Sequence, residues 1–347
     1  MPKTLAVMLG CLLLMGGHAV AGWQTSFTDQ GPTFTDPTDY YYPTVVKQAG
    51  TYHMWFQNHA GSDDLWYTSS ADGKTGWATP VQCLLGGSAF TKWQLHPSVV
   101  DTGSKLRVYW SGSTRGIDVA EADYANPTAF TAVGSDVVTR GASGPFHYDS
   151  APSHGISQWY DAYVYQYGGQ YEAWFTSDWG IHYGVSADGV TGWTAVNAGA
   201  NGIPVFKKDA APAWDSYTMG KATVLRLGPN DYHMWYGSGK SGDPKAYAAG
   251  IGYATSTDGV NWTRDAGNPM FHYTDGATYR DKRTYTPWVM LDSGEARMYF
   301  SAEANATGVD SIGLTTAPMG GGPTALIPEP GVLGLLLLPF LRRRRRA

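Results

Sequence analysis

Ionisable and aromatic side chains stand directly before several strand-like segments of this 347-residue chain. These segment-entry residues are Tyr42 before Pro43, His96 before Pro97, Asp161 before Ala162, Lys221 before Ala222 and Thr286 before Pro287. A carboxylate or imidazole held beside a bound substrate can exchange a proton with it, and an ammonium group can pair with an anion. The set indicates a site, provided that the fold brings these segment starts together.

Further acids and aromatic residues occur in the loops that would surround such a site. As catalytic candidates we select Asp39, Asp161 and Glu303, with Asp36 able to replace Asp39 and Asp215 as an alternative proton donor. As substrate-binding candidates we select Tyr42, Trp93, His96, Trp179, Trp214, Asp215, Lys221 and Arg283. Sugar rings stack on aromatic faces and their hydroxyls need polar partners, so this mixture predicts a sugar site.

The segments belong to a unit that recurs five times along the chain. Its central aromatic strand appears as Met54-Trp55-Phe56, Val108-Tyr109-Trp110, Ala173-Trp174-Phe175, Met234-Trp235-Tyr236 and Met298-Tyr299-Phe300. A following strand recurs with them, typified by Ile181-His182-Tyr183 and Ile251-Gly252-Tyr253. Repeats of a few tens of residues are typical of solenoids and propellers, and short strands separated by Gly, Asp and Pro indicate antiparallel meanders.

These repeats predict an all-β fold, a five-bladed β-propeller of four-stranded antiparallel blades. We expect the blades at about 40–84, 93–140, 157–206, 214–271 and 283–317. The fifth unit lacks a fourth strand, and Gly22-Trp23 resembles Gly76-Trp77 and Gly192-Trp193. We therefore expect an N-terminal strand at 22–28 to complete blade five and close the ring, leaving no open edge.

In a propeller the first strand of each blade lines the central channel. The segment-entry residues, together with the loops between second and third strands, are therefore expected at one mouth. Trp55, Trp174 and Trp235, which repeat at equivalent positions, are expected in the core, as are Trp77, Trp193 and Trp262. Turns such as Ser70-Ala71-Asp72-Gly73 resemble sialidase Asp-boxes, which are structural, and we assign them no chemistry.

Charge and cysteine content exclude several other functions. The formal net charge is −5, and without the terminal Lys3, Glu329 and Arg342 to Arg346 the body is about −10, which argues against a nucleic-acid partner. Of two cysteines, Cys11 lies in a presumed signal peptide, so Cys83 alone predicts neither an internal disulfide nor a cysteine metal site. We expect no cofactor, although His96 could ligate a channel cation, and we expect a monomer.

Both ends of the chain read as targeting segments. Residues 1–21, with Lys3, an apolar run and Ala19-Val20-Ala21, are typical of a secretory signal peptide removed by signal peptidase. Residues 318–330 read as a Gly/Pro-rich linker after the propeller at 22–317. Residues 328–347, with Pro328-Glu329-Pro330, an apolar run and five arginines, resemble the PEP-CTERM signal recognised by an exosortase; a simple tail anchor is the alternative. We expect export across the inner membrane to the cell envelope or surface.

The repeat unit from Met234-Trp235-Tyr236 to Asn268-Pro269 resembles the five-bladed propellers of glycoside hydrolase families 43, 32 and 130. The resemblance spans about residues 22–317 and implies a sugar site in the central channel. In family 43 it implies an Asp base on blade one, an Asp that tunes the pKa on blade three and a Glu acid on blade four. Asp161 matches the blade-three position, whereas Tyr42 and Lys221 stand at the other two.

Two functions therefore stay open. One is a glycosidase that uses Asp161 with Asp39 or Asp36, and Glu303 or Asp215 as proton donor. The other is a non-catalytic module that binds an exopolysaccharide or cell-wall glycan. For the second, His96, Lys221 and Arg283 would favour an acidic glycan or the phosphate used by family 130 phosphorylases.

Overall fold

The structure is a computed structural model, and it describes residues 22–34, 39–58, 64–89, 96–112, 116–138, 159–177, 180–196 and 203–319. The signal peptide and sorting signal expected at 1–21 and 328–347 lie outside these residues, so both stay predictions. Within the described residues no helix is long and apolar enough to cross a membrane.

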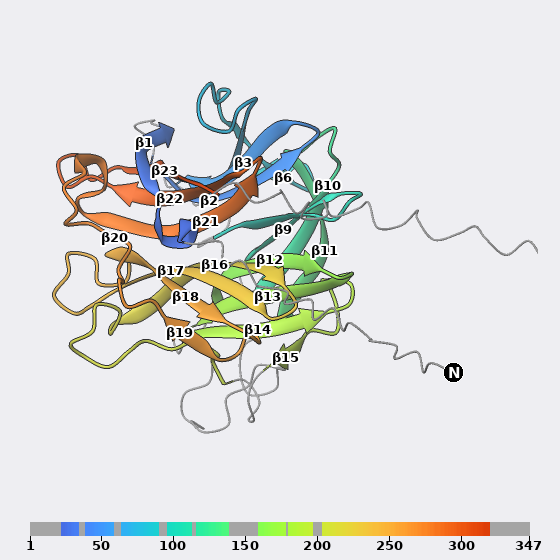
Figure 1. The fold of residues 1–347 in the computed structure, drawn as a ribbon. Helices are drawn as coiled ribbons and strands as arrows, with labels where there is room; N and C mark the ends of the chain where they lie inside the picture. The colour runs from blue at the N-terminus through green and yellow to red at the C-terminus, as the bar shows by residue number, and fades with distance from the viewer. Residues whose placement is uncertain are drawn as a thin grey trace, which may run out of the picture.

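Five antiparallel sheets are arranged as the blades of a five-bladed β-propeller (Figure 1). Blade one contains β2 (Tyr40–Gln48), β3 (Thr51–Asn58), β4 (Asp64–Ser70) and β5 (Val81–Gln82). Blade two contains β8 (Ser98–Asp101), β9 (Leu106–Ser111), β10 (Ile117–Ala122) and β11 (Ala129–Val138). Blade three contains β12 (Trp159–Tyr167), β13 (Gln170–Ser177), β14 (Gly180–Ser186) and β15 (Thr194–Val196).

Blade four contains β16 (Thr218–Gly228), β17 (Asp231–Gly239), β18 (Gly250–Ser256) and β19 (Trp262–Arg264), and β20 (Phe271–His272) also pairs with β18. Blade five contains β21 (Arg283–Asp292), β22 (Glu295–Glu303), β23 (Asp310–Pro318) and β1 (Thr28–Phe34). Two short strands after blade one, β6 (Leu84–Leu85) and β7 (Ser88–Ala89), extend the outer edge of blade two, where β6 runs parallel to β11. The predicted fold class is confirmed.

The recurring aromatic strand forms the centre of each blade because its side chains are buried on both faces of the sheet. Trp55 and Trp235 are fully buried, as are the flanking methionines Met54 and Met234. Trp174 stacks on Tyr183 of the next strand at a centroid distance of 4.6 Å. Trp193 is also buried, whereas Trp77 and Trp262 are only partly buried against the core. Trp174 also contacts Tyr232 of blade four at 6.3 Å, so aromatic packing within and between blades explains the repeat.

The N-terminal segment closes the ring, as predicted. Strand β1 pairs antiparallel with β23, and in Figure 1 the blue β1 lies among the orange-red strands of the last blade. The expected strand bounds of 22–28 were wrong: Trp23 lies in the 3₁₀ turn η1 (Trp23–Thr25), and the strand starts at Thr28. The error is systematic, because Trp77 and Trp193 also precede the fourth strands of their blades. The Gly-Trp pair marks the approach to a fourth strand.

Two hydroxyl groups and one indole link the innermost strands of neighbouring blades by hydrogen bonds. Thr44 Oγ1 accepts from the Val99 amide of blade two at 3.0 Å, and Ser98 Oγ accepts from the Val164 amide of blade three at 3.2 Å. Between blades five and one, Trp288 Nε1 donates to the Val45 carbonyl at 2.9 Å. These bonds satisfy buried backbone groups around the channel and hold the innermost strands in register.

The Ser-x-Asp-Gly turns connect blades at their outer side. In blade three the Thr191 hydroxyl donates to Asp188 Oδ2 at 2.6 Å, and the Thr191 and Val190 amides donate to Oδ1. These bonds hold the pKa of Asp188 well below its usual range. The turn carbonyl of Gly189 then accepts from Tyr109 Oη of blade two at 3.0 Å, and Gly73 of blade one accepts from Tyr299 Oη of blade five at 2.6 Å. Their role is structural.

Ring closure depends on a buried contact made by Trp23. Its side chain is 3% exposed and packs on Trp235 of blade four at 5.9 Å, while Trp235 Nε1 donates to the Gln24 carbonyl at 3.0 Å. We predict that Trp23→Ala lowers the free energy of unfolding by about 3–5 kcal/mol, the usual cost of removing a buried Trp. Denaturant unfolding measures it. Trp262→Ala, which empties a partly buried position, should cost less; an equal or smaller loss for Trp23→Ala would contradict this account of closure.

Candidate functional site

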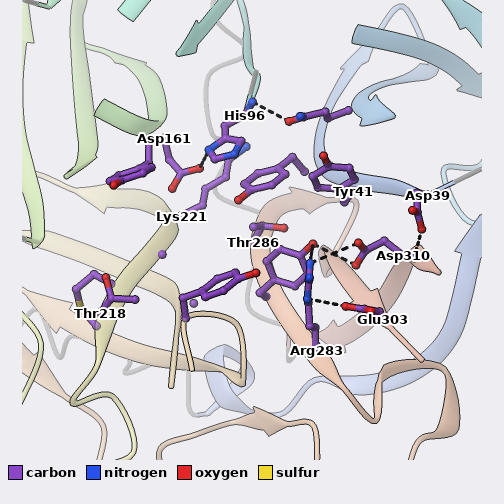
Figure 2. A pocket seen from close by; sticks show the side chains of 18 of the residues that line it. Asp39, Tyr41, His96, Asp161, Thr218, Lys221, Arg283, Thr286, Glu303 and Asp310 are labelled. Atoms are coloured by element: carbon purple, nitrogen blue, oxygen red, sulfur yellow. Dashed lines mark hydrogen bonds and ion pairs between the residues drawn. The ribbon is translucent and has the colours of Figure 1, made fainter. Parts of the chain in front are cut away.

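The innermost strands surround one pocket of about 790 Å³ at the channel mouth. Seven of the residues selected from the sequence line it, namely Asp39, Tyr42, His96, Asp161, Lys221, Arg283 and Glu303. They come from all five blades, and Figure 2 shows His96, Asp161, Lys221, Arg283 and Glu303 around one space. Asp161 and Lys221, which stand on different blades, are therefore brought together as the propeller geometry requires.

A bulge at the entrance to the innermost strand directs these side chains. The pairing register shifts between Tyr41 and Thr44 in blade one, and between Tyr285 and Trp288 in blade five. Comparable shifts follow Trp159 in blade three and Met219 in blade four. A bulge turns one side chain out of the strand's alternation, and proline fits there because it needs no ladder partner. The Tyr42-Pro43 and Thr286-Pro287 pairs in the sequence thus mark the bulges of blades one and five.

Three of the segment-entry residues have a left-handed backbone that glycine would adopt more readily. The φ angles are 57° for Tyr42, 41° for His96 and 51° for Thr286. Nearby polar groups hold them: the Tyr42 amide donates to Ser301 Oγ at 2.8 Å, and the His96 amide donates to Gln57 Oε1 at 3.2 Å. Strain of this kind persists where surrounding contacts fix it, and it is concentrated at functional sites.

One group of side chains spans blades one to four. His96 Nδ1 lies 2.8 Å from Asp161 Oδ1, and both residues are less than 10% exposed. The Tyr42 ring stacks on the His96 imidazole with centroids 3.8 Å apart and planes 10° apart. Burial and the Asp161 carboxylate together raise the pKa of Tyr42, so its phenol stays protonated. Asp161 is thereby fixed in orientation by a neighbouring blade.

Lys221 adds a buried cation to this group. Its Nζ donates to the Pro97 carbonyl at 2.6 Å and lies 5.9 Å from the Tyr42 ring centroid. Burial lowers the pKa of Lys221 to about 8, and Asp161 partly opposes that shift. The ammonium group therefore loses its proton more readily than a surface lysine does. Lys221 occupies the blade-four position at which the family resemblance implies a glutamate.

A second group belongs to blade five. Arg283 Nε pairs with Glu303 Oε2 at 2.6 Å, and a terminal guanidinium nitrogen lies 3.5 Å from Asp310 Oδ2. Lys282 also pairs with Glu303. Asp39 of blade one joins the group through its Oδ1, which accepts from the Asp310 amide at 2.7 Å. Figure 2 shows this group on the other side of the pocket from His96 and Asp161.

Asp310 is the carboxyl group most altered by its surroundings. Burial raises its pKa, Arg283 opposes the shift, and the nearby Glu303 and Asp39 raise it further, to about 7. Tyr285 Oη lies 3.1 Å from Asp310 Oδ1 and can share a hydrogen bond with it. A carboxyl group of this kind carries a proton in mildly acidic solution and can donate it.

The remaining predicted residues are not in the pocket lining. Asp215 is buried beneath blade four, where it accepts from Tyr236 Oη at 3.0 Å and from Arg264 Nε at 2.7 Å. Trp214 packs on Tyr236 at 5.7 Å. The reason is that β16 begins at Thr218, so this pair precedes the strand and turns inward instead of reaching the mouth. Trp93, Trp179 and Asp36 lie outside the described residues.

Sequence reasoning missed Asp310 and several tyrosines of the lining. Asp310 opens β23, two residues before the repeated Ile312-Gly313 pair, so the repeat located its strand. Nothing in the sequence indicated that the Asp310 side chain points into the pocket. Tyr217, Tyr247 and Tyr285 also line the pocket, and all flank innermost strands or the loop between second and third strands. Their positions relative to the strand ends were the available clue.

No group of three or more His, Cys, Asp or Glu side chains among the described residues is arranged to hold a metal ion. His96 directs Nδ1 to Asp161. What the pocket offers is proton exchange from Asp310, a fixed carboxylate at Asp161 and several phenol faces. These groups suit recognition and acid catalysis on a polyhydroxylated ligand.

No protein-family profile matches the chain, and no curated protein sequence matches it. Solved structures do match its fold. The catalytic domain of a family 62 α-L-arabinofuranosidase from Coprinopsis cinerea aligns with a TM-score of 0.61 and 15% identity over 84% of this chain and 96% of that one. A thermostable family-43 glycoside hydrolase gives 0.57 and 15%, over 85% and 96%.

A third match is the α-L-arabinofuranosidase of Podospora anserina, solved in complex with cellotriose. It aligns with a TM-score of 0.60 and 13% identity, over 84% of this chain and 97% of that one. At such identities the comparison shows a shared fold. This chain therefore has the five-bladed fold of these glycoside hydrolases.

The raised pKa of Asp310 gives stability a distinct pH dependence. In the unfolded chain this carboxyl group should ionise near pH 4, against about 7 in the folded protein. Between these values the folded state binds the additional proton, so the group's contribution to the free energy of unfolding falls as pH rises, by at most about 1.4 kcal/mol per pH unit. We predict that Asp310→Asn gains stability relative to the wild type from pH 4 to 7.

Denaturant unfolding of both proteins at pH 4.5, 6 and 7.5 measures this difference. Asp209→Asn, which changes an exposed aspartate, serves as the control and should track the wild type at each pH. A stability difference between Asp310→Asn and wild type that stays constant over this range would contradict the buried, protonated state.

Proposed function

We propose that the protein binds a neutral glycan by a terminal sugar in the central pocket and hydrolyses its glycosidic bond there. The observation that carries the proposal is the pocket's set of four carboxyl groups from three blades, one of which, Asp310, has a pKa raised to about 7. Glycoside hydrolysis needs a protonated carboxyl group at the leaving oxygen and a second carboxylate to assist attack or stabilise charge.

Size and lining support a sugar as the ligand. A volume of about 790 Å³ holds one or two sugar rings, and Tyr41, Tyr42, Tyr160 and Tyr285 are among the lining residues. Phenol rings offer apolar faces for the C–H side of a sugar and hydroxyl groups for its rim. Gln57 and Thr286 add neutral polar groups for the remaining hydroxyls.

The pairing of charges supports a neutral sugar over an acidic one. Arg283 is already matched by Glu303 and Asp310, and the imidazole of His96 by Asp161. Lys221 is directed to the Pro97 carbonyl and lies near Asp161. An incoming carboxylate would have to displace one of these acids and leave it buried and unpaired, which is costly. The cations predicted from the sequence thus hold protein carboxylates in place.

In the proposed reaction Asp310 donates its proton to the leaving glycosidic oxygen. Burial keeps that proton on Asp310, and the negative charge of the neighbouring Glu303, which pairs with Arg283 and Lys282, assists it. Across the pocket, Asp161 accepts a proton from the attacking water while His96 fixes its orientation. The donor thus stands on blade five, in contrast to the blade-four glutamate implied by the resemblance to family 43.

A non-catalytic glycan-binding protein is the second candidate. Lys221 favours it, because this buried ammonium group occupies the position of the expected acid. In this case the same tyrosines and paired charges would hold a sugar without cleaving it. The sequences of the two ends suggest export with signal peptidase and surface sorting by an exosortase, and both candidate functions include this processing. It would place the propeller outside the inner membrane, where polysaccharide is available.

Sugar release by purified variants tests the choice between hydrolysis and binding without cleavage. On neutral 4-nitrophenyl glycosides of arabinofuranose, xylose and glucose, we expect Asp310→Asn and Asp161→Asn to lower kcat by about 100-fold or more, the usual effect of losing an acid or base. Wild-type activity should decline as pH rises through about 7, because Asp310 then loses its proton. Asp209→Asn should keep full activity, because Asp209 is exposed and lies in the segment that precedes blade four.

Each outcome distinguishes the candidates. Release that depends on both pocket aspartates supports hydrolysis. Glycan binding by the wild type without release on any of the substrates supports the second candidate. Release that survives both substitutions would contradict the assigned roles.

A further inference from the structure

We propose that the pocket continues outward over blade four as a second sugar subsite formed by Tyr217 and Tyr247. This inference rests on the proposed function and adds where the rest of the glycan lies. It predicts a ligand longer than one sugar whose terminal unit enters the pocket and whose next unit stacks on these two rings.

Exposure sets these tyrosines apart from the others in the pocket. Tyr217 is 50% exposed and Tyr247 is 44% exposed, whereas Tyr285 is 3% exposed. Six large apolar side chains among the described residues are more than a third exposed, and Tyr217 and Tyr247 are the aromatic ones. Both also line the pocket. Exposing an aromatic face to water is unfavourable unless a partner packs on it, and a sugar ring is a suitable partner.

Tyr217 and Tyr247 belong to different segments of blade four, but these two segments lie close together. Tyr217 directly precedes β16, and its amide donates to the Gly239 carbonyl at 3.0 Å. Tyr247 lies in the loop between β17 and β18, where a side chain added at Gly239 would meet the Ala246 carbonyl at 2.4 Å. Glycine at 239 therefore permits the close approach of the two segments. Figure 2 shows Thr218, which follows Tyr217, at the blade-four side of the pocket.

The backbone that directly follows Tyr247 is held by hydrogen bonds to two other segments. The Ala249 amide donates to the Ser238 carbonyl at 2.9 Å, and the Thr284 amide of blade five donates to the Ala248 carbonyl at 3.0 Å. The Arg283 guanidinium lies 5.7 Å from the Tyr247 ring centroid. A cation on one side of the ring orients it and leaves the rest of its surface for a ligand. Such a preformed surface loses little entropy when a sugar stacks on it.

The positions of these residues indicate which part of the glycan lies in the second subsite. Tyr247 stands next to Arg283 and hence beside the Glu303 and Asp310 group that would protonate the leaving oxygen. The unit attached through that oxygen should therefore lie over Tyr247 and Tyr217. The second subsite thus holds the leaving part of the glycan.

Binding of matched short and long sugars tests the subsite. The probes are cellotriose, xylotriose and 1,5-α-arabinotriose, each with its monosaccharide, titrated calorimetrically into Asp310→Asn protein, in which the proposed hydrolysis is blocked. For the trisaccharide that binds, we expect Tyr217→Ala and Tyr247→Ala each to weaken binding by roughly tenfold, the size of one lost aromatic stacking contact. Monosaccharide binding should stay unchanged.

Two controls separate stacking from other effects. Tyr217→Phe and Tyr247→Phe keep the ring faces and should keep trisaccharide affinity within about twofold. Leu227→Ala removes another exposed apolar side chain, 37% exposed at the far end of β16, and should change nothing.

The contradicting outcomes are distinct from one another. Full trisaccharide affinity in both alanine variants would overturn the subsite and leave the pocket proposal intact. Equal weakening of monosaccharide and trisaccharide would also overturn it, since the rings would then belong to the pocket itself. Failure of the parent protein to bind any of these sugars would overturn the neutral-glycan function, and the subsite with it.

Discussion

A bulge at the start of the innermost strand in blades one, three, four and five is the constraint on which the pocket depends. A regular strand would alternate its side chains between the two faces of a blade, and none would aim along the channel. The register shifts beside Tyr42, Asp161, Lys221 and Thr286 break this alternation at equivalent places. Five blades that are otherwise built from the same apolar strands thus acquire a polar centre.

Such a centre needs a closed ring and internal charge compensation. Closure comes from β1, whose pairing with β23 removes the last free edge between the first and fifth blades. Compensation comes from pairing: His96 lies against Asp161 of the next blade, and Arg283 pairs with Glu303 and Asp310 within blade five. Buried charges are tolerated only when they are paired in this way, and the pairing leaves the pocket with polar hydroxyls and phenol faces for its ligand.

The sequence allowed the fold to be predicted because the blade signals are local and repeated. The Met-Trp-Tyr strand, the Asp-Gly turns and the X-Pro entries each depend on neighbouring residues, and five copies confirm one another. The site was only partly predictable. Residues at strand entries, such as His96 and Lys221, were found because propeller geometry fixes where they point, and Tyr42 was found for the same reason.

Residues whose role depends on distant contacts were not found. Asp310 acquires its raised pKa from burial and from Glu303 and Asp39, and Asp39 is 271 positions away in the sequence. Asp215 looked like a mouth residue, yet its carboxylate is taken up by Arg264 and Tyr236. Whether a carboxyl group serves structure or chemistry is decided by such partners, which no local pattern reveals.

A crystal structure of the Asp310→Asn protein with a bound neutral trisaccharide would test the central claim most directly. The account predicts a terminal sugar between the His96 and Asp161 pair and the Glu303 side of the pocket, with its glycosidic oxygen next to position 310. Sugar bound elsewhere on the propeller, with this pocket empty, would contradict it.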